Sequence, residues 1–165
     1  MRKKIAIVLG SDSDIKIAEK SIEVLKKINV EFEINIISAH RTPEKVREFA
    51  LNAKKNNFGV IIAIAGKSAA LSGVIASHTQ IPVIGVPVSS QDLGGMDALL
   101  STVQMPSGIP VACVAIDGGA NAAWLAARIL ALNDDELFGK LENESINMAE
   151  RIEKKNHEIQ QQYNK

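Results

Sequence analysis

The chain has few cysteines and few aromatic residues, and both shortages exclude classes of site. Cys113 is the only cysteine in 165 residues, so an internal disulfide and a multi-cysteine metal site are excluded. Its place in the apolar run "IPVACVAI" predicts a buried strand thiol in a protein of the reducing cytoplasm. The single Trp and single Tyr do not follow a predicted strand, so the aromatic platform usual for a flavin ring is missing.

The chain also has no charge excess and no long apolar run. Its nineteen basic and nineteen acidic residues cancel, which gives no reason to expect nucleic acid or an anionic membrane surface as a partner. The first apolar run stops at Gly10, too early for the core of a signal peptide. Lys, Asp or Pro breaks every other run before the roughly 18 residues of a transmembrane helix. We therefore expect a soluble, cytoplasmic protein.

Several catalytic motifs are absent as well. There is no GxSxG elbow, no GxGxxG after a predicted strand, and no set of His, Cys or carboxylate residues with metal-ligand spacing. Gly66, Lys67 and Ser68 resemble the end of a phosphate-binding P-loop, but Ile61 stands where that motif requires its first glycine. The chemistry must therefore depend on protons, positioning and anion binding.

Short apolar runs alternate with helical patterns along the first 133 residues, and the length suits one compact domain. This alternation predicts a five-stranded parallel sheet with helices on both faces. Only the strand at residues 31–38 alternates apolar and polar side chains, which is typical of a sheet edge. We expect strands at residues 4–10, 31–38, 59–66, 81–88 and 109–116, and helices at residues 14–29, 42–56, 68–79, 96–105 and 119–132.

After Asn133 the composition becomes polar and helix-prone, with sparse apolar positions. We expect residues 1–133 to form the catalytic part and residues 134–165 a helical arm of the same domain. Two interpretations of the arm stay open: it packs on another subunit, or it is a solvated and partly frayed terminal helix.

Ligands of open parallel sheets bind beyond the carboxyl ends of the strands, where helices present free N–H groups. After the first strand, "GSDSD" places Ser11, Ser13 and Asp14 at a helix start. Helix capping and ligand contact require the same residue types here, so both interpretations stay open.

The next strand is followed by "SAHRTP". Thr42 as N-cap and Pro43 at the first helical position explain the helix start. His40 and Arg41 are left over: Arg offers a planar donor fork for phosphate or carboxylate, and His exchanges protons near neutral pH. A lone loop histidine is more often ordinary surface, so these two residues need support from neighbouring loops.

The later strand-end loops contain small residues. "AGKSAALSG" allows a bound group to approach the backbone closely, and "SSQDLGG" forms a long flexible loop. Gly118 and Gly119 are explained by turns, and Asn121 by a helix cap. His78 at a predicted helix end is explained by the helix dipole, and His157 lies in the polar tail.

Five segments, "GSDSD", "SAHRTP", "VPV", "VQMPSGIPVA" and "NAAWLAARILAL", occur here in the order and spacing of the PurE family, the phosphoribosylaminoimidazole carboxylase catalytic subunits of purine biosynthesis. The resemblance extends from about Ile5 to Leu132. It implies a three-layer α/β/α flavodoxin-like fold, a homo-octamer with active sites at subunit contacts, and catalysis without metal, nucleotide or organic cofactor.

The resemblance also implies roles for single residues. His40 would be the general acid and base, and Ser11, Asp14 and Arg41 would bind the ribonucleotide. Further candidates for substrate contact are Ser13, Ser38, Gly66, Ser68, Ala70 and Leu71.

The family has two classes, and this chain has features of both. Class I members, the 5-(carboxyamino)imidazole ribonucleotide mutases, commonly have a histidine and a proline where this chain has Ala70 and Ser72. These two positions look more like class II members, which carboxylate the free amine with carbon dioxide. "SAHRTP" and "VPVSS" look like class I. We predict the mutase; the alternatives are the class II carboxylase and a non-catalytic module that binds a phosphoribosyl ligand.

Overall fold

A computed structural model describes residues 2–164 and shows one sheet of five parallel strands. The strand order is β2-β1-β3-β4-β5, as in flavodoxin-like folds. The predicted α/β class is therefore confirmed. The strands are β1 (Lys4–Leu9), β2 (Phe32–Ile36), β3 (Phe58–Gly66), β4 (Val83–Val88) and β5 (Ala112–Cys113).

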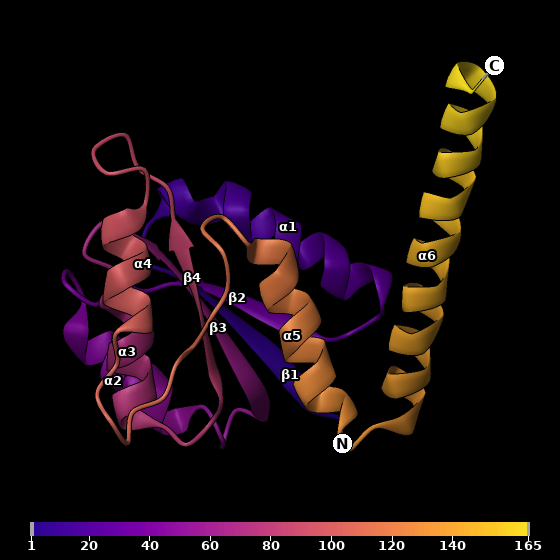
Figure 1. Ribbon diagram of the computed structural model, residues 1–165. Coiled ribbons are helices and arrows are strands. Elements are labelled where there is room, and N and C mark those ends of the chain that lie inside the picture. The colour runs from indigo at the N-terminus through magenta and orange to yellow at the C-terminus, as the bar shows by residue number, and fades with distance from the viewer. Residues whose placement is uncertain (1, 165) are drawn as a thin grey trace.

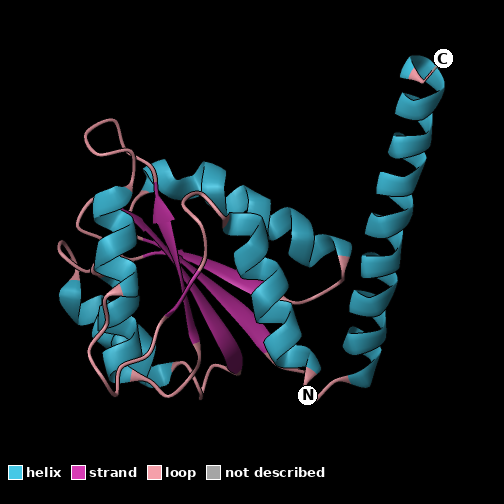
Figure 2. Ribbon diagram, in the orientation of Figure 1, coloured by secondary structure: helices cyan, strands magenta, loops and turns pink. Residues whose placement is uncertain are grey.

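Helices cover both faces of this sheet and make three layers (Figures 1 and 2). α1 and α5 pack side by side on one face, and α2, α3 and α4 cover the other. A 3-10 helix, η1 (Asp12–Asp14), leads into α1. The α-helices are α1 (Ile15–Lys27), α2 (Pro43–Asn52), α3 (Leu71–His78), α4 (Met96–Val103), α5 (Gly119–Ala131) and α6 (Asp135–Tyr163).

The central strand β1 explains why the strands are apolar without interruption. Ile5 and Ile7 pack toward α1 and α5, whereas Ala6 and Val8 pack toward α2 and α3, and all four are fully buried. Both faces of the strand therefore require apolar side chains. At the sheet edge, β2 leaves Ile36 59% exposed, which confirms the edge position predicted from its alternation.

The fifth strand is much shorter than the predicted residues 109–116. It has two residues, which pair with Ile84 and Gly85 of β4. Pro110 just before it has no N–H to donate to a ladder, and Asp117 soon after it has a left-handed φ of 57° that turns the chain. Cys113 is consequently half-buried rather than buried, although this partial burial does raise the pKa of its thiol.

The predicted N-cap position of Thr42 is confirmed, whereas the predicted cap at Asn121 is wrong. α2 begins at Pro43 as expected, but the hydroxyl of Thr42 accepts a hydrogen bond from the Ser38 N–H and donates one to the Ser38 carbonyl. Thr42 is thus the N-cap residue, but its hydroxyl closes the preceding loop instead of capping a helix N–H. At α5 the N-cap position belongs to Gly118, so Asn121 lies inside the first turn.

Gly119 at the start of α5 lets this helix approach α1 closely. The hydroxyl of Ser21 donates to the Gly119 carbonyl across 2.7 Å, and a Cβ added at Gly119 would lie 2.2 Å from the Ile17 carbonyl oxygen. Only glycine therefore fits this contact.

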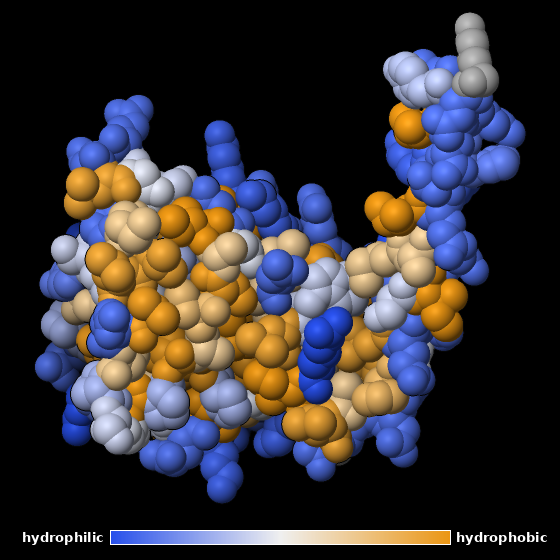
Figure 3. All heavy atoms as spheres, viewed as in Figure 1, coloured by the Kyte–Doolittle hydropathy of each residue, from blue (hydrophilic) through white to orange (hydrophobic). Residues whose placement is uncertain are grey.

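α6 leaves the body of the molecule as an arm (Figure 1). Its first turn is fixed, because Asp134 caps the Leu137 N–H at 3.0 Å and the Leu137 side chain is buried. An ion pair between Lys27 and Glu144 joins the arm to α1. Residues 145–164 are all exposed, and their surface is mostly hydrophilic (Figure 3). None of the helices within residues 2–164 is long and apolar enough to cross a membrane.

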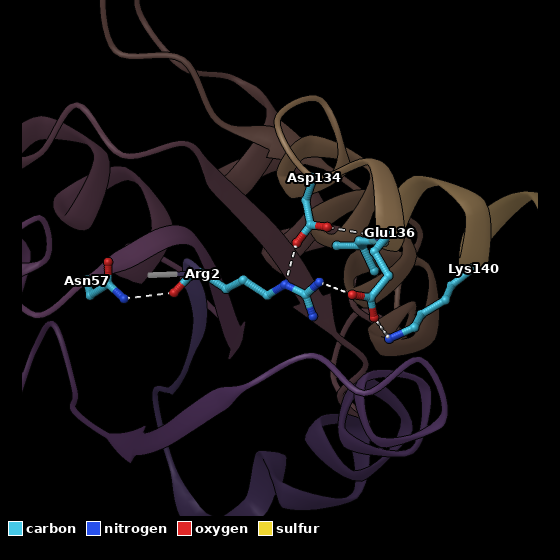
Figure 4. A network of polar contacts seen from close by, with 6 residues as sticks. Arg2, Asn57, Asp134, Glu136 and Lys140 are labelled. Carbon is cyan, nitrogen blue, oxygen red and sulfur yellow. Dashed lines mark hydrogen bonds and ion pairs between the residues drawn. The ribbon is translucent and has the colours of Figure 1, made fainter.

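A polar network around Arg2 holds the base of the arm (Figure 4). Arg2 Nε lies 3.0 Å from Asp134 Oδ2, and the same guanidinium pairs with Glu136. Lys140 donates to Glu136 from the next turn, and Asn57 donates to the Arg2 carbonyl. The bond from Arg2 and then the bond from Lys140 lower the pKa of Glu136 to about 2.

Candidate active site

A cavity of about 550 Å³ opens at the carboxyl ends of the strands, between the loops after β1, β2, β3 and β4. All ten site residues predicted from the sequence line it, although their roles remain predictions. The lining consists of Gly10, Ser11, Ser13, Asp14, Ser38, Ala39, His40, Arg41, Ala65, Gly66, Lys67, Ser68, Ala69, Ala70, Leu71, Val88, Ser89 and Ser90.

A larger cavity, of about 810 Å³, lies at the opposite end of the sheet, around Arg2, Lys3 and Leu130. None of the predicted site residues lines it. Its walls are the amino ends of strands, the carboxyl ends of α1 and α5, which expose carbonyl groups, and the first turn of α6, where Asp134 already caps the Leu137 N–H. The smaller cavity is therefore the candidate active site.

The loop after β1 confirms the capping interpretation of its polar residues. Ser11 N–H donates to Asp14 Oδ2 at 3.0 Å, and Ser13 N–H donates to the Ser11 hydroxyl at 3.4 Å, which together form a capping box. The same residues also line the cavity, so capping leaves them facing it, and their contact with a ligand stays a prediction.

Asp14 is an unusual carboxyl group because it is 4% exposed. Burial raises its pKa, and this rise is opposed by hydrogen bonds from Ser13 and Ser11 and by the charge of Arg41. The cavity therefore places a partly desolvated acid beside a guanidinium.

Arg41 joins the loops after β1 and β2. Its Nη2 donates to the Gly10 carbonyl at 3.1 Å, and its Nε donates to the Ser38 hydroxyl at 3.4 Å. A guanidinium has five N–H donors, so others remain to bind an anion in the cavity. The arrangement orients the planar donor fork before any ligand arrives.

His40 is exposed, and no hydrogen bond or ion pair of its side chain occurs within the described residues 2–164. The fold therefore does not require a histidine at this position. His40 lines the cavity together with Arg41, and imidazole is a side chain that exchanges protons near neutral pH.

The loop after β3 forms the small-residue wall. Ala69, Ala70 and Leu71 line the cavity, and Ala70 is the N-cap of α3 without a side-chain cap. The N-terminal end of α3 thus faces the cavity with uncapped N–H groups. Ser72 is buried and does not line the cavity, so Ala70 is the only one of the two class-dependent positions that faces it.

The sequence-based site set missed Lys67, Ser89 and Ser90, which also line the cavity. Ser89 donates to Asp117 from its N–H at 2.9 Å and from its hydroxyl at 2.7 Å. The hydroxyl of Ser90 is buried and has no partner among the described residues. The rule that ligands bind after parallel strands applied equally to the end of β4 and could have added both serines.

Comparisons with known proteins identify the family of this chain. Residues 4–151 match the family model described as AIR carboxylase. The chain is 55% identical over 151 residues to the N5-carboxyaminoimidazole ribonucleotide mutase of Methanocaldococcus jannaschii, covering 92% of this chain and 91% of that protein. It is 52% identical over 141 residues to the mutase of Haemophilus influenzae, covering 84% and 86%.

Solved structures give the same result. The crystal structure of Treponema denticola PurE superposes with a TM-score of 0.88 at 34% sequence identity, covering 96% of this chain and 99% of that chain. The resemblance to the PurE family is thus confirmed by sequence and by fold. With its strand-end cavity and these relatives, the chain belongs to the AIR carboxylase family.

Proposed function

We propose that this protein is a 5-(carboxyamino)imidazole ribonucleotide mutase of de novo purine biosynthesis, which forms 4-carboxy-5-aminoimidazole ribonucleotide. The observation that carries the proposal is the convergence of His40 with Arg41, Ser11 and Asp14 on one cavity. Relatives named as mutases, 43% to 55% identical to this chain, support it.

The loops after β1 and β2 bind the ribonucleotide in this proposal. Arg41 and the hydroxyls of Ser11 and Ser13 are donors suited to phosphate oxygens. Asp14 accepts hydrogen bonds and therefore suits ribose hydroxyl groups. The bond between Arg41 and the Gly10 carbonyl fixes the two loops relative to each other.

His40 carries the chemistry as a proton shuttle. The protonated imidazole gives its proton to the exocyclic nitrogen. The bond from this nitrogen to the carboxyl carbon then breaks, the electron pair of that bond stays on nitrogen, and carbon dioxide leaves. The adjacent ring carbon of the electron-rich aminoimidazole then attacks carbon dioxide. His40, now neutral, removes the proton from that carbon and restores aromaticity.

Carbon dioxide must stay beside the ring between the two steps. The wall formed by Ala69, Ala70 and Leu71 is small and apolar enough to hold a small neutral molecule against the ring. Confinement supplies an effective concentration that dissolved carbon dioxide does not reach.

Ala70 favours the class II reaction as the second candidate, because it faces the cavity where class I members commonly have histidine. Two assays separate the reactions: one supplies the carbamate substrate, the other supplies the free amine with bicarbonate. We expect efficient turnover of the carbamate. Efficient turnover of only the second mixture would show the class II carboxylase instead.

We also infer a cytoplasmic homo-octamer in which residues 134–165 serve as an arm of the catalytic part at residues 1–133. The exposed arm and the exposed apolar residues Met96 and Leu100 of α4 support subunit contacts. Light scattering should give the mass of eight 17.8 kDa chains. A truncation after Glu144 should give a smaller species, and an unchanged octamer would exclude the arm from assembly.

A further inference from the structure

Lys67 lies at the mouth of the cavity, and the proposed function gives it no role. It follows Gly66 at the end of β3 and lines the cavity, yet its side chain is 72% exposed. Its ammonium group pairs with Asp92 in the loop between β4 and α4. This pair connects two strand-end loops across the edge of the site.

The backbone at Lys67 is in a conformation that favours glycine. Its φ is 54°, in the left-handed region, where a Cβ is unfavourable. In the turn that follows, the Lys67 carbonyl accepts a hydrogen bond from the Ala69 N–H at 2.8 Å. A residue that keeps a side chain at such a position, on the rim of a cavity, points to a use for that side chain.

The ion pair with Asp92 does not explain why a lysine side chain is kept at this position. The Asp92 side chain is 65% exposed, and exposed pairs contribute little to stability because water and salt screen them. Asp97, in the first turn of α4, is the other carboxylate that acts on Lys67. The ammonium group can therefore exchange Asp92 for a ligand anion at small cost, since Asp92 returns to water.

The substrate of the proposed mutase has two anionic groups, and the cavity has two permanent cations on different loops. Arg41 sits with Ser11 and Ser13, which suits the phosphate. Lys67 lies on the loop after β3, next to Ser68 and the uncapped end of α3. The second cation is thus placed for a second anionic group.

We propose that Lys67 binds the carboxylate of the substrate in place of Asp92 and thereby selects the carboxylated ribonucleotide over the uncarboxylated amine. This inference rests on the proposed function, since it concerns the same site. It assigns Asp92 the role of a competitor that holds Lys67 at the rim until the substrate arrives.

Calorimetry with two ligands tests the proposal: 4-carboxy-5-aminoimidazole ribonucleotide, and 5-aminoimidazole ribonucleotide without the carboxyl group. Lys67→Gly removes the ammonium group, and glycine adopts the left-handed φ of this position without strain, so this variant should fold. We expect its Kd for the carboxylated ligand to rise about tenfold, with the Kd for the uncarboxylated ligand unchanged. Lys67→Arg should restore most of the affinity.

Asp92→Asn separates substrate binding from a purely structural latch. If Lys67 exchanges partners, removing its competitor should leave the Kd for the carboxylated ligand equal or lower. If the pair only ties the two loops together, Asp92→Asn and Lys67→Gly should weaken both ligands alike, and the proposal would be overturned. Lys155→Gln, an exposed change of equal charge on the arm, is the matched control.

The calorimetric test of Lys67 is independent of the turnover assay that tests the mutase function. Lack of carbamate turnover by the unmodified protein would refute the proposed function, and the calorimetric comparison would still test Lys67. Normal turnover with equal affinities for Lys67→Gly and unmodified protein would refute only the role of Lys67. Lys67→Gln gives the same comparison without a glycine.

Discussion

The Nη2 atom of Arg41 donates a hydrogen bond to the carbonyl oxygen of Gly10 across 3.1 Å. This bond links two loops that are 31 residues apart in the chain. The arginine that is placed to bind an anion is therefore also the residue that aligns the loop carrying Ser11 and Asp14. A single substitution should affect both roles.

Arg41→Lys should raise the KM about tenfold, because an ammonium group cannot reproduce the planar fork that reaches Gly10, Ser38 and a ligand together. Steady-state kinetics with the carbamate substrate provides the measurement. Arg47→Lys, on the exposed surface of α2, is the control with the same chemical change. Equal KM values for both variants would contradict the role of Arg41.

His40→Asn should lower kcat at least about 100-fold, because asparagine cannot exchange protons near neutral pH. The melting temperature should stay the same, since the His40 side chain is exposed and makes no hydrogen bond or ion pair within residues 2–164. Ligand binding measured by calorimetry should persist. Unchanged turnover would instead support the non-catalytic binding module.

Asp14→Asn should stabilise the protein at pH 7 while weakening ligand binding. Burial raises the pKa of Asp14, so the native state loses stability as the pH rises from 3.8, the ordinary value, through the raised pKa. The neutral amide avoids this cost, and the melting temperature should rise by a few degrees. The gain should vanish below pH 3.8, where both side chains are neutral. A lower melting temperature at pH 7 would contradict the desolvation argument.

Gly119→Ala should destabilise the protein by about 3 kcal/mol, because its Cβ would overlap the Ile17 carbonyl and separate α5 from α1. Gly139→Ala is the matched control in α6, where a Cβ meets nothing within 4 Å. That change should stabilise the helix by about 0.5 to 1 kcal/mol. Urea unfolding gives both values, and similar effects at the two positions would refute the packing argument.

Glu136→Gln should weaken the base of the arm at neutral pH and have no effect in acid. A carboxyl group with a lowered pKa contributes stability above its ordinary pKa of 4.5 and loses it as the pH falls through about 2. The urea midpoints of the variant and the unmodified protein should therefore differ at pH 7 and converge near pH 2. If the two urea midpoints differed equally at both pH values, the loss of stability would come from the shape or hydrogen bonding of the glutamine amide and not from the lost charge.

Local patterns in the sequence determined most of the fold. Uninterrupted apolar strands such as β1 and the alternating β2 predicted central and edge positions, because side-chain periodicity follows directly from which faces are covered. The rule that ligands bind after parallel strands also placed His40, Arg41, Ser11 and Asp14 together at the carboxyl ends of the strands. In parallel strands all carboxyl ends meet there, so no long-range information was needed.

Contacts between distant segments decided the rest. The sequence did not show that β5 has only two residues, that Thr42 closes its loop through Ser38, or that Ser89 pairs with Asp117. It also did not show that Lys67 meets Asp92, 25 residues later, at the mouth of the cavity. Composition and periodicity describe which face a residue lies on, whereas these partners depend on how loops of different length pack in three dimensions.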